Sequence, residues 1–183
     1  MPNVAVLLAD GFETVEALTV VDVLRRAGIR VRTVSVMGTT QVITAQQVQI
    51  TADGVLADLD DASLDCVVVP GGLPATKRLR ADTRVCALLR EAMADPEKTV
   101  AAICAGPSIL ASLGLLEGRR ATVFPGCETD FPAGALDSEN DVVVDGDLIT
   151  ARSMSRSLRF AIAIVERLAG PDAARKVLQG VAP

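Results

Sequence analysis

The chain has 183 residues, half of them hydrophobic, and 23 acidic against 18 basic side chains give it a net charge of −5. It has no histidine, which excludes His-based acid–base catalysis, Ser-His-Asp and Cys-His triads and His-ligated metal sites. The acidic balance argues against nucleic acid as a partner, and no apolar run reaches the roughly 20 residues that span a membrane. Without a basic and apolar leader, we expect a cytoplasmic protein that forms a single domain over residues 1–183.

Apolar runs and turn residues predict an alternation of strands and helices. In chain order, the predicted elements are strand 3–8, helix 13–27, strand 29–36, a hairpin within 40–51, strand 64–69, helix 82–94, strand 99–103, helix 105–113, strands 120–123, 141–144 and 147–151, and helices 155–168 and 171–178. This alternation indicates an α/β fold with a mainly parallel sheet and helices on both faces. In such folds ligands bind at the carboxyl ends of the strands.

Cys104 stands between a predicted strand and a predicted helix, and Ala105 and Gly106 follow it. A sharp strand-to-helix turn exposes its central side chain and needs small neighbours. The unpaired N–H groups and partial positive charge of a helix start favour thiolate, so we expect a lowered thiol pKa. The alternative is a small buried hydrophobic residue, which is the expected role of Cys66 and Cys86.

Glu16 lies on the apolar face of the first predicted helix, together with Val20, Val23 and Ala27. Apolar neighbours would desolvate its carboxyl group, raise the pKa and make it a proton shuttle. The alternative is an acidic side chain in the first turn that complements the helix dipole and reaches water.

Pro70-Gly71-Gly72 forms a turn directly after a predicted strand. Glycine permits close backbone approach, so N–H groups here could form one half of an oxyanion hole, with the N–H of Ala105 as the other half. The alternative is an ordinary turn. Cys127 lies in a predicted loop, either without a role or as a redox partner of Cys104.

Glu16, the VVVPGG segment at 67–72 and the AICAGP segment at 102–107 together resemble the ThiJ/PfpI superfamily, in particular the branch of the parkinsonism-associated protein deglycase and its YajL-like bacterial relatives. The resemblance also covers VDVLRRAGI at 21–29 and RFAIAIVERLAG at 159–170. It implies a flavodoxin-like three-layer α/β sandwich and a homodimer. The sequence itself offers no evidence for a metal or organic cofactor. Cys104 would be the reactive, oxidisable cysteine, with Glu16 hydrogen-bonded to its sulfur and Gly72 and Ala105 as the backbone donors.

The resemblance implies several activities, all of which use small aldehydes or glycated molecules as substrates. One is glyoxalase III activity, which converts methylglyoxal into a hydroxy acid, and another is protein deglycase activity. A non-catalytic oxidative-stress sensor or redox-regulated chaperone is the second hypothesis, and a structural relative that has lost the chemistry is the third. An exposed thiolate is both nucleophilic and oxidisable, so the first two are compatible.

The sequence departs from the family pattern around the expected pocket, whose further candidates are Gly71, Phe124, Arg26 and Ser153. Phe124 replaces the histidine of many members, so proton transfer would depend on Glu16. The Gly-Pro-Gly-Thr segment of many members reads Ser153-Met154-Ser155-Arg156 here, a bulkier and more basic wall. Arg26 matches a family arginine, although pairing with Asp22 on the helix surface is the alternative.

Overall fold

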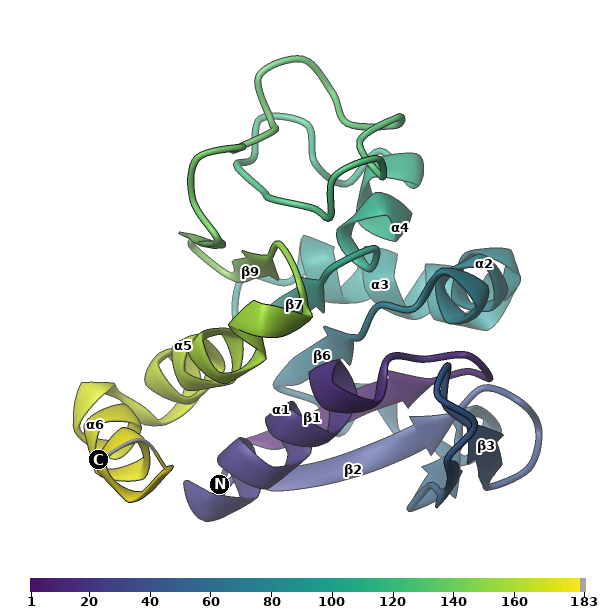
Figure 1. The fold of residues 1–183 in the computed structure, drawn as a ribbon, viewed down its shortest axis with the longest axis vertical. Coiled ribbons are helices and arrows are strands. Elements are labelled where there is room, and N and C mark those ends of the chain that lie inside the picture. The colour runs from purple at the N-terminus through teal and green to yellow at the C-terminus, as the bar shows by residue number, and fades with distance from the viewer. Residues whose placement is uncertain (182–183) are drawn as a thin grey trace.

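Seven strands form the main sheet of the computed structural model, which describes residues 1–181 (Figure 1). They are β1 (Asn3–Leu8), β2 (Arg30–Ser35), β5 (Gly54–Val55), β6 (Cys66–Val69), β7 (Thr99–Ile103), β8 (Val142–Asp145) and β9 (Leu148–Ala151). Their order is β5-β2-β1-β6-β7-β9-β8, and every neighbouring pair is parallel except β8 and β9. The mainly parallel α/β fold is therefore confirmed.

The centre of the sheet consists of the strands with the longest apolar runs. In β1, the residues from Val4 to Leu8 have exposed fractions of 0 %, and β6 and β7 are buried along their whole length. Strands covered on both faces need apolar side chains at every position. Because β1, β6 and β7 are parallel neighbours, their carboxyl ends meet at one edge, where the segments that follow them lie close together.

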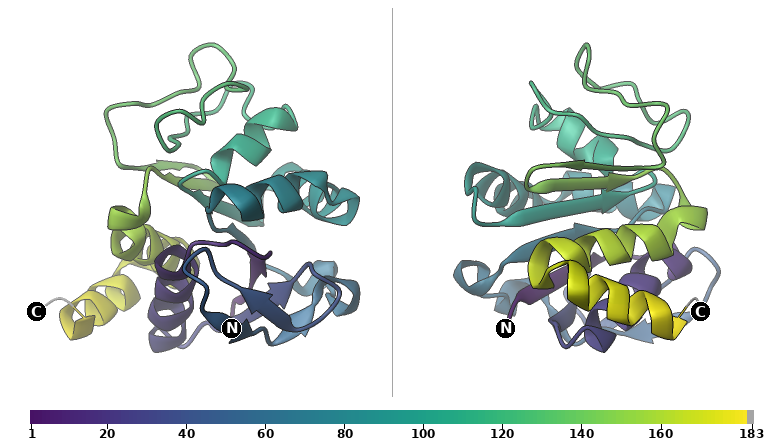
Figure 2. Two further views of the ribbon diagram at one scale, coloured as in Figure 1. Left: turned by 45° about the vertical axis from the view of Figure 1, so that its right-hand side comes forward. Right: turned by 90° about the vertical axis from the view of Figure 1, so that its left-hand side faces the viewer.

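Helices cover both faces of the sheet and make three layers (Figures 1 and 2). One layer contains α1 (Thr14–Arg26), α5 (Ser157–Ala169) and α6 (Pro171–Val181), with α5 in contact with both of the others. The other contains α2 (Leu73–Ala81), α3 (Thr83–Ala94) and α4 (Pro107–Ser112). A separate antiparallel sheet, β3 (Gln41–Ile43) with β4 (Gln49–Thr51), confirms the predicted hairpin.

The structure differs from the predicted elements in two places. The strand expected at 120–123 is wrong, because Ala121 makes only an isolated bridge to Leu136. The Thr122 N–H donates to the Thr150 side chain and not to its backbone, and β8 pairs with β9 and takes the edge position. The sequence reading also missed α2, which begins just after the glycine turn and has Pro74 in its first turn, where proline is well tolerated.

None of the helices described within residues 1–181 is long and apolar enough to cross a membrane.

Candidate active site

Cys104 follows the last residue of β7 and has a backbone φ of 61°, a left-handed conformation that non-glycine residues rarely adopt. Hydrogen bonds hold this backbone on both sides. Its N–H donates to the Ala151 carbonyl at 2.8 Å, and its carbonyl accepts from the Phe124 N–H at 2.9 Å. Gly106 allows the close turn, since a Cβ there would lie 2.6 Å from the Val69 carbonyl oxygen. The structure thus contains the predicted sharp turn, with a half-buried thiol at its apex.

Glu16 lies in the first turn of α1 and is completely buried, with an exposed fraction of 0 %. Its Oε2 accepts a 2.8 Å hydrogen bond from the Gly71 N–H, whereas its buried Oε1 has no such partner within the described residues. Burial raises the pKa of Glu16 to about 7, against smaller lowering effects from Cys104 and Gly71. The desolvated carboxyl group that the helix pattern predicted is present, and the alternative of a water-exposed side chain is wrong.

The Glu16 carboxyl group and Cys104 lie side by side at Gly71, and each shifts the pKa of the other. Glu16 raises the pKa of the thiol, and Cys104 lowers that of the carboxyl group. Burial, followed by the charge of Glu16, raises the pKa of Cys104 to about 12, and the Ala105 N–H opposes this only in part. The lowered pKa expected from the sequence is therefore wrong. The helix behind the cysteine, α4, has six residues and starts with a proline that lacks an N–H, so its partial charge cannot offset desolvation.

Gly71 and Gly72 have different places in the site. A Cβ on Gly71 would lie 2.5 Å from the Glu16 Oε2 and 2.7 Å from the Cys104 Cβ, so only glycine lets these two groups approach each other. The Gly71 N–H is already bonded to Glu16. Gly72 has a φ of 96° and borders the cavity beside Cys104. The nominated donors Gly72 and Ala105 therefore line the same cavity as the sulfur.

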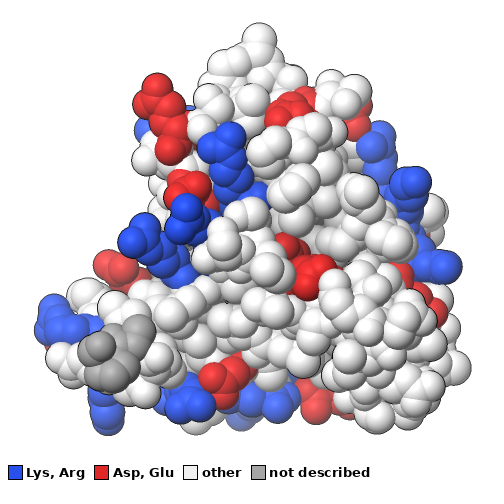
Figure 3. Space-filling model, in the orientation of Figure 1, with Lys and Arg blue, Asp and Glu red and all other residues white. Residues whose placement is uncertain are grey.

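The cavity in front of Cys104 has a volume of about 460 Å³. Its walls are formed by Glu13, Glu16, Gly72, Leu73, Cys104, Ala105, Phe124, Ser153, Met154 and Ser155. Phe124 and Ser153, both expected in the pocket, do line it. Figure 3 draws the face of the molecule seen in Figure 1, and near its centre, over the start of α1, acidic atoms are surrounded by uncharged surface. The carboxyl-end edge of the sheet is thus a mainly uncharged pocket around one sulfur.

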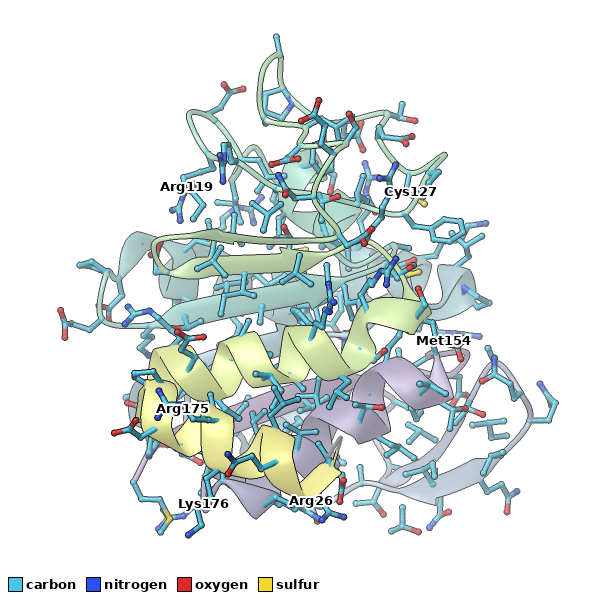
Figure 4. The ribbon with its side chains drawn as sticks, turned by 60° about the vertical axis from the view of Figure 1, so that its left-hand side comes forward. Arg26, Arg119, Cys127, Met154, Arg175 and Lys176 are labelled. Atoms are coloured by element: carbon cyan, nitrogen blue, oxygen red, sulfur yellow. The ribbon has the colours of Figure 1, made fainter. Side chains whose placement is uncertain are left out.

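Arg26 does not belong to this pocket. It is the last residue of α1, ten positions from Glu16 and so about 15 Å away along the helix. It pairs with Asp22 at 2.8 Å and lines a separate cavity with Lys176 on α6 (Figure 4). The surface pair with Asp22, given as the alternative in the sequence reading, is the observed arrangement.

Sequence reasoning missed two pocket residues, Glu13 and Leu73, whereas Met154 lines the pocket as expected from the 153–156 segment. Leu73 directly follows the glycine turn, so its position after a strand end was the available signal. The Gln46 side chain donates a 2.8 Å hydrogen bond to the Glu13 carboxylate and holds it at the pocket.

The other cysteines lie outside the pocket. Cys66 and Cys86 are buried, as expected. Cys127 is half-buried in a neighbouring cavity that shares only Leu73 with the first. Within residues 1–181, no group of three or more Cys, Asp or Glu side chains gathers as a candidate metal site. The chemistry that this arrangement can perform is thus that of a thiol beside a carboxyl group.

Comparison with known proteins gives close matches. The DJ-1/PfpI family model matches residues 2–167. "Protein dj-1beta" of Drosophila melanogaster is 36% identical over 177 residues, which are 96% of this chain and 94% of that protein. "Protein DJ-1 homolog B" of Arabidopsis thaliana is 35% identical over 173 residues, and the match covers 93% of this chain but only 39% of that longer protein. The structure of oxidized Toxoplasma gondii DJ-1 superposes with a TM-score of 0.94 at 32% identity, covering 99% of this chain and 98% of that one.

Proposed function

This chain belongs to the DJ-1/PfpI family, and on that premise we propose that it is a Cys104-dependent enzyme of the glyoxalase III or deglycase type, acting on reactive dicarbonyls. One observation supports the proposal: the half-buried Cys104 thiol and the buried Glu16 carboxyl group lie side by side at the wall of one cavity. A nucleophile with an adjacent proton acceptor is the basic unit of covalent catalysis.

The proposed reaction starts from the thiol, because the pKa of Cys104 is raised to about 12. As the sulfur attacks the aldehyde carbon, its proton passes to the Glu16 carboxylate, and the carbonyl electron pair moves to the oxygen. The N–H groups of Gly72 and Ala105 stabilise that oxygen until Glu16 returns the proton, which completes the hemithioacetal. A carboxyl group with a pKa of about 7 can accept and release protons near neutral pH.

Product formation then needs no external oxidant or reductant. Glu16 takes a proton from the former aldehyde carbon, and the electron pair of that C–H bond forms an enediol as the neighbouring oxygen gains a proton. Return of the proton to the neighbouring carbon, with loss of the hydroxyl proton from the sulfur-bearing carbon, gives the thioester of a hydroxy acid. Water cleaves the thioester and restores the thiol. For methylglyoxal, the sum is addition of one water molecule to give lactate. Histidine takes no part, since the chain has none.

A methylglyoxal-to-lactate assay tests the proposal. We expect Cys104→Ser to abolish lactate formation and Glu16→Gln to reduce it about a hundredfold or more, the range typical of acid–base groups. Cys127→Ser, which removes a half-buried thiol from the neighbouring cavity, should keep wild-type turnover. Full turnover by Cys104→Ser would refute the proposal.

A second candidate function, an oxidative-stress sensor or redox-regulated chaperone, is favoured by the accessible Cys104 and by the oxidized state of the Toxoplasma relative. Dilute peroxide should then add two oxygen atoms at Cys104, read by peptide mass spectrometry, with little dicarbonyl turnover. Oxidation first at Cys86 or Cys127 would count against it. We also propose a homodimer, which sedimentation equilibrium would detect.

A further inference from the structure

The mouth of the Cys104 pocket is formed by three large apolar side chains that are only partly buried. Leu73, Phe124 and Met154 have exposed fractions of 61 %, 44 % and 47 %. They come from α2, from the loop after α4 and from the turn after β9, so three separate segments place apolar surface around one sulfur. Apolar surface grouped at a cavity is typical of a site for an apolar ligand group.

The charges at this pocket are all acidic. Glu13 and Glu16 line it, and within the described residues neither lysine nor arginine does. Gln46 donates a 2.8 Å hydrogen bond to the Glu13 carboxylate and accepts one of 2.6 Å from the Thr14 hydroxyl, which keeps the Glu13 charge at the pocket. An acidic wall of this kind repels anions, and low-dielectric side chains around it strengthen the effect.

Arg156 is the basic residue nearest in sequence to the pocket wall, and it is already paired. Its guanidinium lies 2.9 Å from the Asp141 carboxylate, directed to the segment before β8. The residues of this segment that line the pocket include Ser153 and Ser155, whose hydroxyl oxygens are 3.0 Å apart. The uncharged part of the polar lining can therefore donate hydrogen bonds to a carbonyl oxygen, but within residues 1–181 no lysine or arginine lines the pocket to bind a carboxylate or phosphate.

We infer that the Cys104 pocket selects uncharged α-oxoaldehydes with an apolar substituent, such as arylglyoxals, and rejects anionic ones. This inference rests on the proposed function and names its substrate class. The aldehyde carbon would lie at the sulfur, with the substituent against Leu73, Phe124 and Met154. The basic wall expected from the Ser153–Arg156 segment is not what selects the substrate.

Two substrates of matched size test the role of charge. We expect kcat/KM for 4-methylphenylglyoxal to exceed that for 4-carboxyphenylglyoxal by about tenfold or more, because the carboxylate would lose water to apolar side chains and meet the negative charge of the pocket. Glyoxal, which has no substituent, serves as the reference.

Substitutions at the mouth test the role of the apolar contacts. Phe124→Ala and Met154→Ala should each lower the ratio of kcat/KM for 4-methylphenylglyoxal to that for glyoxal by about threefold to tenfold. Val144→Ala is the matched control, since Val144 is equally exposed, at 51 %, but lies on β8 away from the pocket. Sedimentation equilibrium of all variants separates these effects from a changed association state.

A labelling experiment tests the pocket without turnover. The rate ratio of iodoacetamide to iodoacetate at Cys104, measured by peptide mass spectrometry, should exceed the same ratio for glutathione. Glu13→Gln should bring the two ratios closer by about threefold or more. The control Glu97→Gln removes an exposed carboxylate just before the opposite end of β7 and should change nothing.

The outcomes distinguish the two proposals. If no oxoaldehyde is consumed but the labelling ratios behave as expected, the proposed enzyme activity fails while the pocket's preference for uncharged ligands stands. If oxoaldehydes are consumed but the aryl and charge ratios do not respond to Phe124→Ala, Met154→Ala and Glu13→Gln, the inference is overturned. The inference would also be overturned if Val144→Ala or Glu97→Gln changed these ratios as much as the pocket substitutions do.

Discussion

The Gly71 N–H donates a 2.8 Å hydrogen bond to the Glu16 carboxylate, joining the turn after β6 to the first turn of α1. The two residues are 55 positions apart in the sequence. This contact orients the carboxyl group beside Cys104, and it depends on the missing side chain of Gly71 as much as on its N–H.

Gly71→Ala should therefore damage both the fold and the site. The added Cβ would lie 2.5 Å from the Glu16 Oε2 and 3.2 Å from the Ala105 nitrogen, so side chain or backbone must move. We expect a loss of about 1–3 kcal/mol in the free energy of unfolding, measured with urea, together with a large loss of lactate formation. Gly180→Ala is the control, because no atom lies within 4 Å of its added Cβ and alanine favours the helix. Equal effects of the two substitutions would contradict this prediction.

Glu16→Gln should stabilise the protein at alkaline pH. The pKa of Glu16 is raised from its usual 4.5 to about 7, so the folded state keeps a proton that the unfolded chain releases near pH 4.5. The stability that this proton contributes is fully present below about pH 4.5 and is lost as the pH rises through 7. A shift of this size corresponds to about 3 kcal/mol.

Urea unfolding at pH 4.5 and at pH 8.5 measures this effect. The gain of the Glu16→Gln variant over wild type should be larger at pH 8.5 by about 2–3 kcal/mol, whereas the exposed Glu97→Gln should show no such difference. If the gain in the free energy of unfolding were the same at both pH values, the pKa of Glu16 would not be raised in the folded protein.

Alkylation of Cys104 by iodoacetamide should be slow at neutral pH. A thiol with a pKa of about 12 is almost entirely protonated at pH 8, so labelling should be tens of times slower than that of free cysteine. The rate should rise through pH 10 without a plateau. Glu16→Gln should accelerate labelling, because it removes a negative charge that raises the pKa of the sulfur. Labelling faster than that of free cysteine at pH 7, or slower in Glu16→Gln, would show a thiolate stabilised by a protonated Glu16.

The left-handed backbone conformation of Cys104 should lower the free energy of unfolding of every variant that has a side chain at this position. Its φ of 61° suits glycine, so Cys104→Gly should be at least as stable as Cys104→Ala in urea unfolding. At the ordinary helical position Ala111, replacement by glycine should cost about 1 kcal/mol. If Cys104→Gly is about 1 kcal/mol less stable than Cys104→Ala, the turn is not strained.

Much of the fold could be predicted because the signals are local. The continuous apolar run at 3–8 and the spacing of Ala17, Val20, Val21 and Leu24 reflect backbone periods that any strand or helix imposes. The segment at 120–123 contains the β-branched Thr122 and Val123 but is not a strand, and β8 takes the edge position beside β9. The composition of a segment shows which secondary structure it can form. Whether it pairs with a given strand also depends on which other segments can pair with that strand.

The sequence by itself determined the α/β class, the absence of histidine chemistry and the turn that presents Cys104, since each depends on residue identity or on neighbours along the chain. Only the tertiary structure decided that Glu16 is buried against Gly71, that Arg26 lies in another cavity and that Glu13 and Leu73 line the pocket of Cys104. It also reversed the expected direction of the Cys104 pKa shift. Burial and electrostatic interaction sum over all groups near in space, and at this site those groups come from segments far apart in the sequence.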